Sequence, residues 1–495
     1  MQALKIHPRD TVAIAIKELH KGTMVTIEAT TVRLRDDIPA GHKFSLGGIA
    51  AGTEVIKYGY SIGVASRDIE MGEWVHDHNL QSHLGGVGEY SWAPSGKKPA
   101  VPSRKLTFNG YVRPDGSVGI RNELWVVPMV GCVNGIAEQI VKITRARGLP
   151  VNIENVVAFP HPFGCSQLGG DLEHTQKILA GLVKHPNAGG VLLLWLGCEN
   201  NTPEGFKAVL GDIDSQRIRT LNCQDAGDEI DTGVRMLSEL LVYSAQFKRQ
   251  PVPLSRLRVG FKCGGSDGFS GLTANPLAGR ICDRVTGGGG TAVITEVPEM
   301  FGAETILFNR CVSEKVFKQA VKMVNGFKSY FISHNEPVGE NPSPGNHAGG
   351  ITTLEEKSLG CIQKGGDSLV TAVLNYGEQA RLPGLNLLDG PGNDIVATTA
   401  LAAAGCHLVI FTTGRGSPLG GPVPVIKISS NSQIAQAKAG WIDFDAGRGI
   451  EGISLDMLAE ELMALMLETA SGEVLTRNEI MDFRDMAIWK GGVTL

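Results

Sequence analysis

From about residue 107 onward, short runs of consecutive apolar residues alternate with longer segments of helical periodicity. Strands that are apolar at every position are covered on both faces, as in a parallel α/β sheet. The expected strands cover 123–130, 151–159, 191–197, 257–263, 291–297, 385–389 and 407–414, and helices are expected near 134–147, 171–184, 203–210 and 313–330. A proline-containing connection near 251–256 divides the series, which predicts one α/β domain over 107–250 and a C-terminal α/β domain over 255–495.

Residues 1–92 follow a different pattern. A small unit recurs as Ile38-Pro39-Ala40-Gly41, as Ile49-Ala50-Ala51-Gly52 and as Ile69-Glu70-Met71-Gly72. Short apolar stretches closed by glycine turns, such as 23–34 and 53–65, predict a small β domain. Residues 93–106, rich in proline, serine and lysine, are expected to be a linker.

Composition narrows the class of protein. The 495 residues carry 46 basic and 51 acidic side chains without a basic block, so neither nucleic acid nor an anionic membrane is an expected partner. The N-terminus lacks the pattern of a signal peptide, and we expect a cytoplasmic protein. Nine cysteines without a Cys-x-x-Cys pair argue against a disulfide framework. The 64 glycines, roughly twice the usual share, suit loops in which the backbone approaches a ligand closely.

Polar, glycine-containing loops follow nearly every expected strand. In open α/β sheets ligands bind beyond the carboxyl ends of strands, so these loops are the candidate site. The candidate metal ligands in them are His161, Cys165, Cys198, Glu199, Cys263, Asp267, Glu296 and Glu299. Thiolate and imidazole suit iron or zinc, and carboxylates extend the choice to manganese or magnesium. Two arrangements remain open: a single ferrous ion, or an iron–sulfur cluster on Cys165, Cys198 and Cys263, although each cysteine could also be a buried apolar residue.

The same loops contain groups that suit a small acid. Glycine-rich segments at 264–268 and 414–416 can direct backbone N–H groups at an anion, and Arg415 can bind a carboxylate with two hydrogen bonds. The alternative is a tight turn beside a surface arginine. Neither segment matches a phosphate-binding loop, and nucleotides are disfavoured. The candidate substrate-binding residues are Asn79, Asn122, Ser266, Asn393, Asp394 and Arg415.

Histidines in the small domain are candidates for acid–base chemistry. His76 and His78 are two residues apart in an expected strand, which would place both imidazoles on one side. His42 and Lys43 lie upstream and complete the set of candidate catalytic residues. The alternative is a solvated strand end.

Several of these segments together resemble the altronate/galactarate dehydratase family of sugar-acid hydro-lyases. The motifs are 161–165, 197–199, 263–276, 341–346 and 411–416, and the likeness extends from residue 1 to the last four residues. The resemblance implies an N-terminal β-clip domain of the SAF type, two further α/β domains and a requirement for Fe²⁺, with Mn²⁺ as an alternative. His76 to Asn79 favours D-altronate over galactarate, whereas His347 departs from a lysine that is common in the family.

The reaction implied by the resemblance converts D-altronate to 2-dehydro-3-deoxy-D-gluconate and water. In it a base removes the C2 proton and an acid protonates the departing C3 hydroxyl, while positive charge stabilises the enolate. The open alternatives are dehydration of galactarate or a related aldonate, a sulfolactate-type lyase, and a sugar-acid sensor without activity. A homodimer is the expected assembly.

Overall fold

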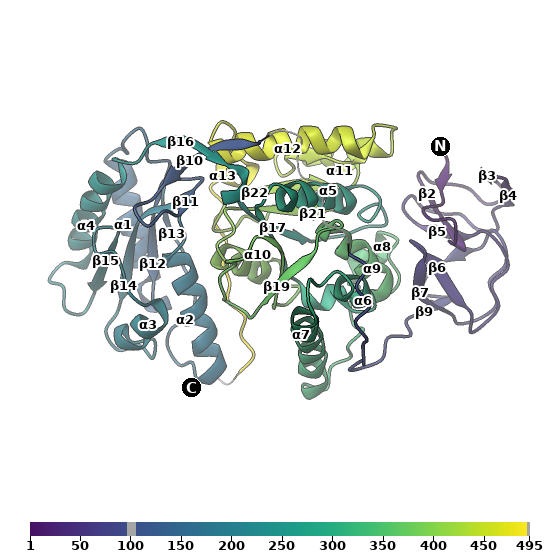
Figure 1. Cartoon of the computed structure of the whole chain (residues 1–495), viewed down its shortest axis with the longest axis horizontal. Coiled ribbons are helices and arrows are strands. Elements are labelled where there is room, and N and C mark those ends of the chain that lie inside the picture. Colours follow the sequence, from purple (N-terminus) through teal and green to yellow (C-terminus); the bar gives the residue numbers. More distant parts are fainter. Residues whose placement is uncertain (97–104, 493–495) are drawn as a thin grey trace.

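The computed structural model describes residues 1–96 and 105–492, so most of the expected linker (97–104) lies outside the described residues. Figure 1 shows three bodies in a row, with the C-terminal domain between the N-terminal β domain and the second domain. The predicted fold class, a small β domain followed by two α/β domains with largely parallel sheets, is confirmed.

The N-terminal domain consists of short antiparallel pairs. Its four-stranded sheet has the order β1-β2-β5-β8, with the hairpin β3-β4 and the sheet β6-β7-β9 beside it. The strands are β1 (Ala3–Leu4), β2 (Val12–Ala15), β3 (Met24–Ile27), β4 (Thr30–Arg33), β5 (Lys43–Ser45), β6 (Glu54–Lys57), β7 (Tyr60–Ala65), β8 (Trp74–Val75) and β9 (Leu80–Gln81).

The recurring Ile-x-x-Gly unit forms the turns of this domain. Ile38 pairs with Leu19, and Ile49 pairs with Ile69, in isolated β-bridges. The isoleucines are buried, and the glycine that ends each unit has a φ near +80°, which favours glycine. At Gly72 a Cβ atom would also lie 2.1 Å from the carbonyl oxygen of Arg33, so close backbone approach requires glycine there as well.

The second domain is a parallel sheet of order β13-β12-β14-β15 between helices. Its elements are β12 (Glu123–Pro128), α1 (Asn134–Ala146), β13 (Val156–Ala158), α2 (Gly169–Val183), β14 (Ala188–Trp195), α3 (Pro203–Leu210), β15 (Ile218–Asn222) and α4 (Glu229–Ser244), with the 3₁₀ turn η1 (Gly131–Val133) after β12. The central strands β12 and β14 are buried at every position, as their continuous apolar sequence predicts.

Two neighbouring strands carry the chain into and out of the second domain. β10 (Thr107–Val112) pairs in antiparallel fashion with β16 (Arg249–Pro253), and with β11 (Val118–Gly119) on its other side. The second and C-terminal domains also share a hydrophobic core, which includes Trp125 and Ile178 from one and Leu401 from the other. At Gly181 of α2, a Cβ atom would lie 2.4 Å from the carbonyl oxygen of Ala403.

The C-terminal domain contains a parallel sheet of order β19-β20-β18-β17-β21-β22-β23. Its strands are β17 (Arg258–Cys263), β18 (Thr291–Ile294), β19 (Val370–Leu374), β20 (Gly384–Leu388), β21 (Leu408–Thr413), β22 (Val425–Ser429) and β23 (Phe444–Asp445). Its α-helices are α5 (Ala274–Gly287), α6 (Glu304–Phe308), α7 (Glu314–Ser333), α8 (Pro344–Ala348), α9 (Leu354–Cys361), α10 (Asp394–Ala403), α11 (Ser432–Ala437), α12 (Leu455–Ser471) and α13 (Arg477–Ile480). The 3₁₀ turns are η2 (Leu254–Arg256), η3 (Val297–Met300), η4 (Ile362–Gly365) and η5 (Gly447–Gly449).

Two expectations about local structure were wrong. The expected strand over 151–159 is shorter, since only Val156–Ala158 pairs. His76 and His78 are not in a strand, because β8 ends at Val75 and the Asn79 side chain accepts a hydrogen bond from the His76 backbone N–H, 2.9 Å away, in a turn. His76 is therefore buried and His78 exposed.

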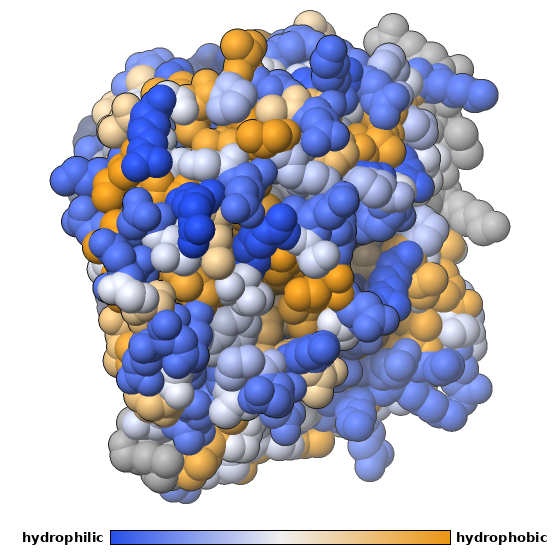
Figure 2. All heavy atoms as spheres, turned by 90° about the vertical axis from the view of Figure 1, so that its left-hand side faces the viewer, coloured by the Kyte–Doolittle hydropathy of each residue, from blue (hydrophilic) through white to orange (hydrophobic). Residues whose placement is uncertain are grey.

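The outer surface of the second domain is mixed in character. Figure 2 shows the outer face of the second domain, where apolar side chains are scattered among hydrophilic ones. Within residues 1–96 and 105–492, no helix has the length and apolar character needed to cross a membrane.

Candidate active site

The candidate site lies at the carboxyl edge of the seven-stranded sheet. Cys263 is the last residue of β17, and Glu296 and Glu299 follow β18. The helix α9 and the turn η4 bring Cys361 and Lys364 to the same place. Side chains that are up to 101 residues apart in the sequence therefore contact one another.

Two thiols and a carboxylate form the centre of this site. The Sγ atoms of Cys263 and Cys361 lie 2.9 and 3.1 Å from Oε2 of Glu299, and 3.3 Å from each other. All three side chains are buried. Among the described residues, they are the group of three potential metal ligands whose donor atoms lie within 4.8 Å of one another.

Buried lysines surround this trio. The Lys364 ammonium donates to Cys263 Sγ and to Glu296 Oε2, both at 2.9 Å, and Lys357 lies 2.9 Å from Glu299 Oε1. Lys262 lies 3.2 Å from Glu296 and also contacts Asp394. Burial alone would raise the pKa of Glu299, but Lys357 and Lys364 lower it to about 2. The hydrogen bond with Cys263, together with burial, raises the pKa of the Cys361 thiol well above its usual value.

The donor set fits a divalent metal ion. With neutral thiols, the ammonium groups of Lys262, Lys357 and Lys364 balance the carboxylates of Glu296, Glu299 and Asp394. Ionisation of both thiols would leave two uncompensated negative charges in a buried place, which a divalent cation would neutralise. Thiolate and carboxylate ligands suit iron or zinc.

A cavity of about 550 Å³ opens beside the same edge. Its lining includes Asp267, Phe269, Gly349, Arg415 and Asn431. Asp267 accepts hydrogen bonds from Ser270 and Ser430, and its buried position raises the pKa of its carboxyl group. The Arg415 side chain is exposed in this cavity, where it can bind the carboxylate of a small acid.

The N-terminal domain covers the loop 341–350 of the C-terminal domain. His42 Nε2 lies 3.3 Å from the carbonyl oxygen of Ala348, and His76 Nε2 lies 3.1 Å from that of His347. The imidazoles of His42 and His76 are stacked, with 5.3 Å between their centroids. Burial lowers the pKa of His42 to about 4, and the buried Nδ1 atoms of His42 and His347 have no hydrogen-bond partner.

The loop 341–350 joins these histidines to the sheet edge. Asn346 Nδ2 donates to the carbonyl oxygen of Ser266 at 2.8 Å, and Gly268 N donates to the carbonyl oxygen of Gly349 at 2.7 Å. Lys43, a candidate catalytic residue, instead donates to Thr352, Glu356 and the Gly350 carbonyl oxygen. All its ammonium hydrogens thus have acceptors, which is the arrangement of a residue that holds two domains together.

Most of the remaining candidate residues of the C-terminal and N-terminal domains contact local partners. Asn393 caps α10 through its hydrogen bond with Val396 N, and Asp394 contacts Lys262. Asn79 stabilises the turn that positions His76. The hydroxyl of Ser266 is buried without a hydrogen-bond partner.

The candidates in the second domain do not join this group. His161 uses both ring nitrogens on backbone groups, with Pro128 O at 2.7 Å and Phe163 N at 3.1 Å. Glu199 accepts from Leu196 N and Gly197 N. Asn122 accepts from Arg113 and donates to two carbonyl groups within its own domain. Cys165 and Cys198 are exposed in the second domain, so neither belongs to the group of close donor atoms around Cys263.

The sequence interpretation missed Cys361 and the lysines at positions 262, 357 and 364. Cys361 ends a helix and follows no strand, so the carboxyl-edge rule does not select it. Lys262 within the largely apolar run 259–263 was the available signal, because a lysine in a strand that is expected to be buried needs a nearby acid.

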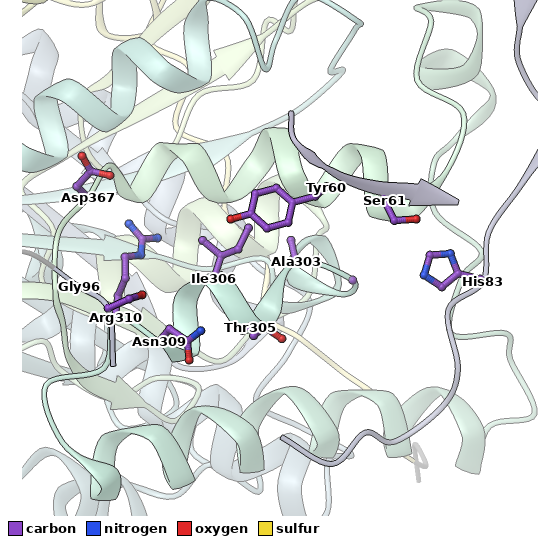
Figure 3. A pocket seen from close by; sticks show the side chains of 12 residues that line it. Tyr60, Ser61, His83, Gly96, Ala303, Thr305, Ile306, Asn309, Arg310 and Asp367 are labelled. Atoms are coloured by element: carbon purple, nitrogen blue, oxygen red, sulfur yellow. The ribbon is translucent and has the colours of Figure 1, made fainter. Parts of the chain in front are cut away.

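A second cavity lies on another side of the N-terminal domain. It has a volume of about 620 Å³ and lies between the β6–β7 hairpin and α6. In Figure 3, Arg310 and Asp367 lie at one end and His83 at the other, with Tyr60 and Ser61 between them. No candidate residue from the sequence is among the residues that line it.

The fold and the site define a three-domain α/β protein in which a β domain covers a buried centre of thiols, carboxylates and lysines. Family models match all three parts: the altronate/galactarate dehydratase SAF domain over 1–83, the second domain of D-galactarate dehydratase/altronate hydrolase over 110–245, and the D-galactarate/altronate dehydratase C-terminal domain over 254–494. The chain belongs to the altronate/galactarate dehydratase family, and the resemblance seen in its motifs is confirmed.

Curated relatives match along nearly the whole length. The chain is 51% identical to altronate dehydratase of Escherichia coli (strain K12), with all of both chains covered. It is 48% identical to altronate dehydratase of Bacillus subtilis (strain 168), over 99% of each chain. Galactarate dehydratase (L-threo-forming) of Escherichia coli (strain K12) is 33% identical, over 96% of this chain and 93% of that one.

Proposed function

We propose that this protein is a hydro-lyase that dehydrates D-altronate to 2-dehydro-3-deoxy-D-gluconate and water. The observation that carries the proposal is the identity of about half of all residues with two altronate dehydratases over the full chain. Galactarate is the second candidate substrate, supported by the 33% identity with a galactarate dehydratase. The 48–51% identity with altronate dehydratases over the full chain disfavours a sulfolactate-type lyase and a sensor without activity.

The reaction needs positive charge beside the substrate and two proton transfers. Loss of the C2 proton places a second negative charge on the carboxylate end, and the C3 hydroxyl leaves only when it is protonated. Arg415, exposed in the 550 Å³ cavity, would bind the substrate carboxylate. His42, which is neutral at pH 7 with its pKa lowered to about 4, would accept a proton at its free Nδ1, and His76 would supply one.

Cys263, Glu299 and Cys361 would hold the metal ion, for which we propose Fe²⁺, with Mn²⁺ as the alternative. A divalent ion supplies Lewis-acid stabilisation of substrate oxygen atoms when bound. Lys364 and Lys357 would fix the positions of the ligands through their hydrogen bonds to Cys263 and Glu299. The protein would act in the cytoplasm, and as a homodimer, which is the commonest symmetric assembly of soluble proteins.

The test is an anaerobic assay of the purified full-length chain with D-altronate, galactarate and related aldonates. Formation of a 2-keto acid is measured with Fe²⁺, Mn²⁺ or a chelator present. We expect 2-keto acid from D-altronate at a higher kcat/KM than from galactarate, and loss of turnover with the chelator. The absence of product from every sugar acid with both metals supplied would contradict the proposal.

A further inference from the structure

Three thiols are exposed at one edge of the second domain. They are separate from the buried group of Cys263, Glu299 and Cys361 in the C-terminal domain. Cys132, Cys165 and Cys198 follow β12, β13 and β14, which are adjacent parallel strands. The other six cysteines of the chain are buried. The carboxyl ends of neighbouring parallel strands meet at one edge, so the three exposed thiols share a single face of the domain.

The loops that carry these cysteines are joined to one another by backbone contacts. Gly131 N, next to Cys132, donates to Phe163 O, and Asn201 N donates to Gly164 O, next to Cys165, both at 2.9 Å. A Cβ atom on Gly164 would lie only 2.1 Å from Met129 O. The thiols are therefore held on a rigid set of loops that approach each other as closely as backbone permits.

The N-termini of three helices, α1, α2 and α3, favour negative charge at this edge. Cys132 precedes α1, Cys165 precedes α2 and Cys198 precedes α3, each by a few residues. The N-terminal ends of three helices, with their unpaired N–H groups and positive dipole ends, thus lie at the same edge as the thiols. Such surroundings favour an anionic group bound at this edge.

The spacing of these three sulfur atoms does not suit a single small ion. A mononuclear site needs its donor atoms close together, and these three sulfur atoms do not form a group within 4.8 Å among the described residues. Other potential ligands on these loops are occupied, because His161 and Glu199 bond to backbone groups, and Cys223, after β15, packs in the core. The three sulfur atoms are thus further apart than the ligands of one ion, and these loops supply no fourth protein ligand to them.

We propose that Cys132, Cys165 and Cys198 bind a [4Fe–4S] cluster with three thiolates, which leaves one iron without a protein ligand. A cluster spreads its thiolate ligands further than one ion does, and cysteine thiolates are its usual ligands. This set replaces Cys263 of the sequence hypothesis with Cys132, whose strand β12 lies between β13 and β14. The site is separate from the Cys263, Glu299 and Cys361 centre and does not depend on the proposed dehydratase activity.

The test is anaerobic reconstitution of the full-length protein with ferrous iron and sulfide, followed by desalting. We expect about four iron atoms and four acid-labile sulfides per chain for the cluster, with visible thiolate-to-iron absorbance. Acid-labile sulfide distinguishes the cluster from an ion at Cys263, since a single ion carries none. Thiol titration supplies a measurement on the unmodified chain: three fast-reacting thiols before loading and none after it.

Variants localise the cluster. Cys132→Ser, Cys165→Ser and Cys198→Ser should each lose most of the labile sulfide, and thermal melting checks that each variant is folded. Cys223→Ala is the matched control, because Cys223 directly follows β15 at the same edge but is buried, and it should retain the cluster. Absence of labile sulfide after reconstitution, or three thiols that stay reactive, would overturn the proposal; so would retention of the cluster in the three serine variants.

Discussion

The Lys43 ammonium of the N-terminal domain lies 2.8 Å from Oε2 of Glu356, with both side chains 1% exposed. Lys57 lies 2.6 Å from the other oxygen of the same carboxylate. Burial alone would raise the pKa of Glu356, but the two lysines lower it to about 2, so one carboxylate from α9 serves two cations of the covering domain. This contact fixes the domain that carries His42 and His76 above the sheet edge.

Removal of this carboxylate should therefore be costly. Glu356→Gln leaves Lys43 and Lys57 buried without a counter-charge, and we expect a loss of about 3–5 kcal/mol in the free energy of unfolding. Urea denaturation monitored by fluorescence measures the change. Glu173→Gln is the control, since its ion pair with Lys177 is exposed and should contribute nothing measurable. Equal free energies of unfolding in the two variants would contradict the role of Glu356 as the counter-charge of the two buried lysines.

The metal centre predicts a specific loss of affinity. Cys361→Ser and Glu299→Gln should each weaken Fe²⁺ binding at this centre by at least about tenfold, because each removes a donor atom. Anaerobic equilibrium dialysis with iron analysis measures this in protein free of labile sulfide. Cys406→Ala, a buried cysteine of the same domain outside the trio, should bind as the unmodified chain does. Unchanged affinity in both donor variants would exclude this ligand set.

The two histidines of the 76–78 turn should differ in their effect on turnover. His76 is buried at 5% exposure beside His42 and His347, whereas His78 is exposed. For a proton-transfer role we expect His76→Asn to lower kcat by about 10²–10⁴, and His78→Asn by less than about tenfold. Steady-state kinetics with D-altronate measures kcat of both variants. Equal losses of kcat would contradict a selective role of His76.

Arg415 should act on substrate binding. Arg415→Lys keeps the charge but removes the second hydrogen bond to a carboxylate, and we expect kcat/KM for D-altronate to fall roughly 10–100-fold, mainly through KM. Arg381→Lys is the control, because Arg381 is exposed away from the cavity residues. If kcat falls and KM does not change, the carboxylate contact is not the function of Arg415.

Acid should destabilise the protein below pH 6.5 through its buried histidines. Burial lowers the pKa of His161 to about 4 and that of His185 to about 3. The unfolded chain then binds more protons than the folded one between those values and about 6.5, so this contribution is complete above pH 6.5 and is lost as the pH falls. We expect a slope of about 1.4 kcal/mol per pH unit for each histidine.

The matched variant for this slope is His185→Gln, which keeps a side-chain donor for Cys406 O, the acceptor 3.0 Å from His185 Nε2. Urea titrations from pH 7.5 to 5 should show a shallower decline than in the unmodified chain. His20→Gln, which removes an exposed histidine, is the matched control. An identical slope in His185→Gln would mean that His185 titrates as a solvated histidine.

Much of the architecture followed from the continuous apolar runs, because a strand buried on both faces in a parallel sheet has no polar positions. The rule that ligands collect beyond the carboxyl ends of strands selected Cys263, Glu296 and Glu299, which do lie together. It could not select Cys361, whose position depends on how α9 packs against that edge. It also grouped Cys165 and Cys198 with Cys263, although the sequence places them in different domains, since the sequence does not tell whether the edges of two sheets meet at one site.

The turn at His76 shows a different limit. A two-residue alternation suggests a strand, but the His76 backbone N–H donates to the Asn79 side chain in a turn that follows β8, which ends at Val75. The two imidazoles therefore differ in burial. Side-chain capping of this kind competes with strand pairing over one or two residues, which is shorter than any periodic pattern can resolve.

The paired strands β10 and β16 make the second domain an insertion whose entry and exit are neighbours. A connection through these two strands alone would allow the inserted domain to move relative to the C-terminal domain. The close approach of Gly181 to Ala403, together with the hydrophobic core that the two domains share, opposes that motion. The two α/β domains therefore pack as one frame, in which the exposed thiol edge of one domain is held at a set spacing from the buried centre of the other.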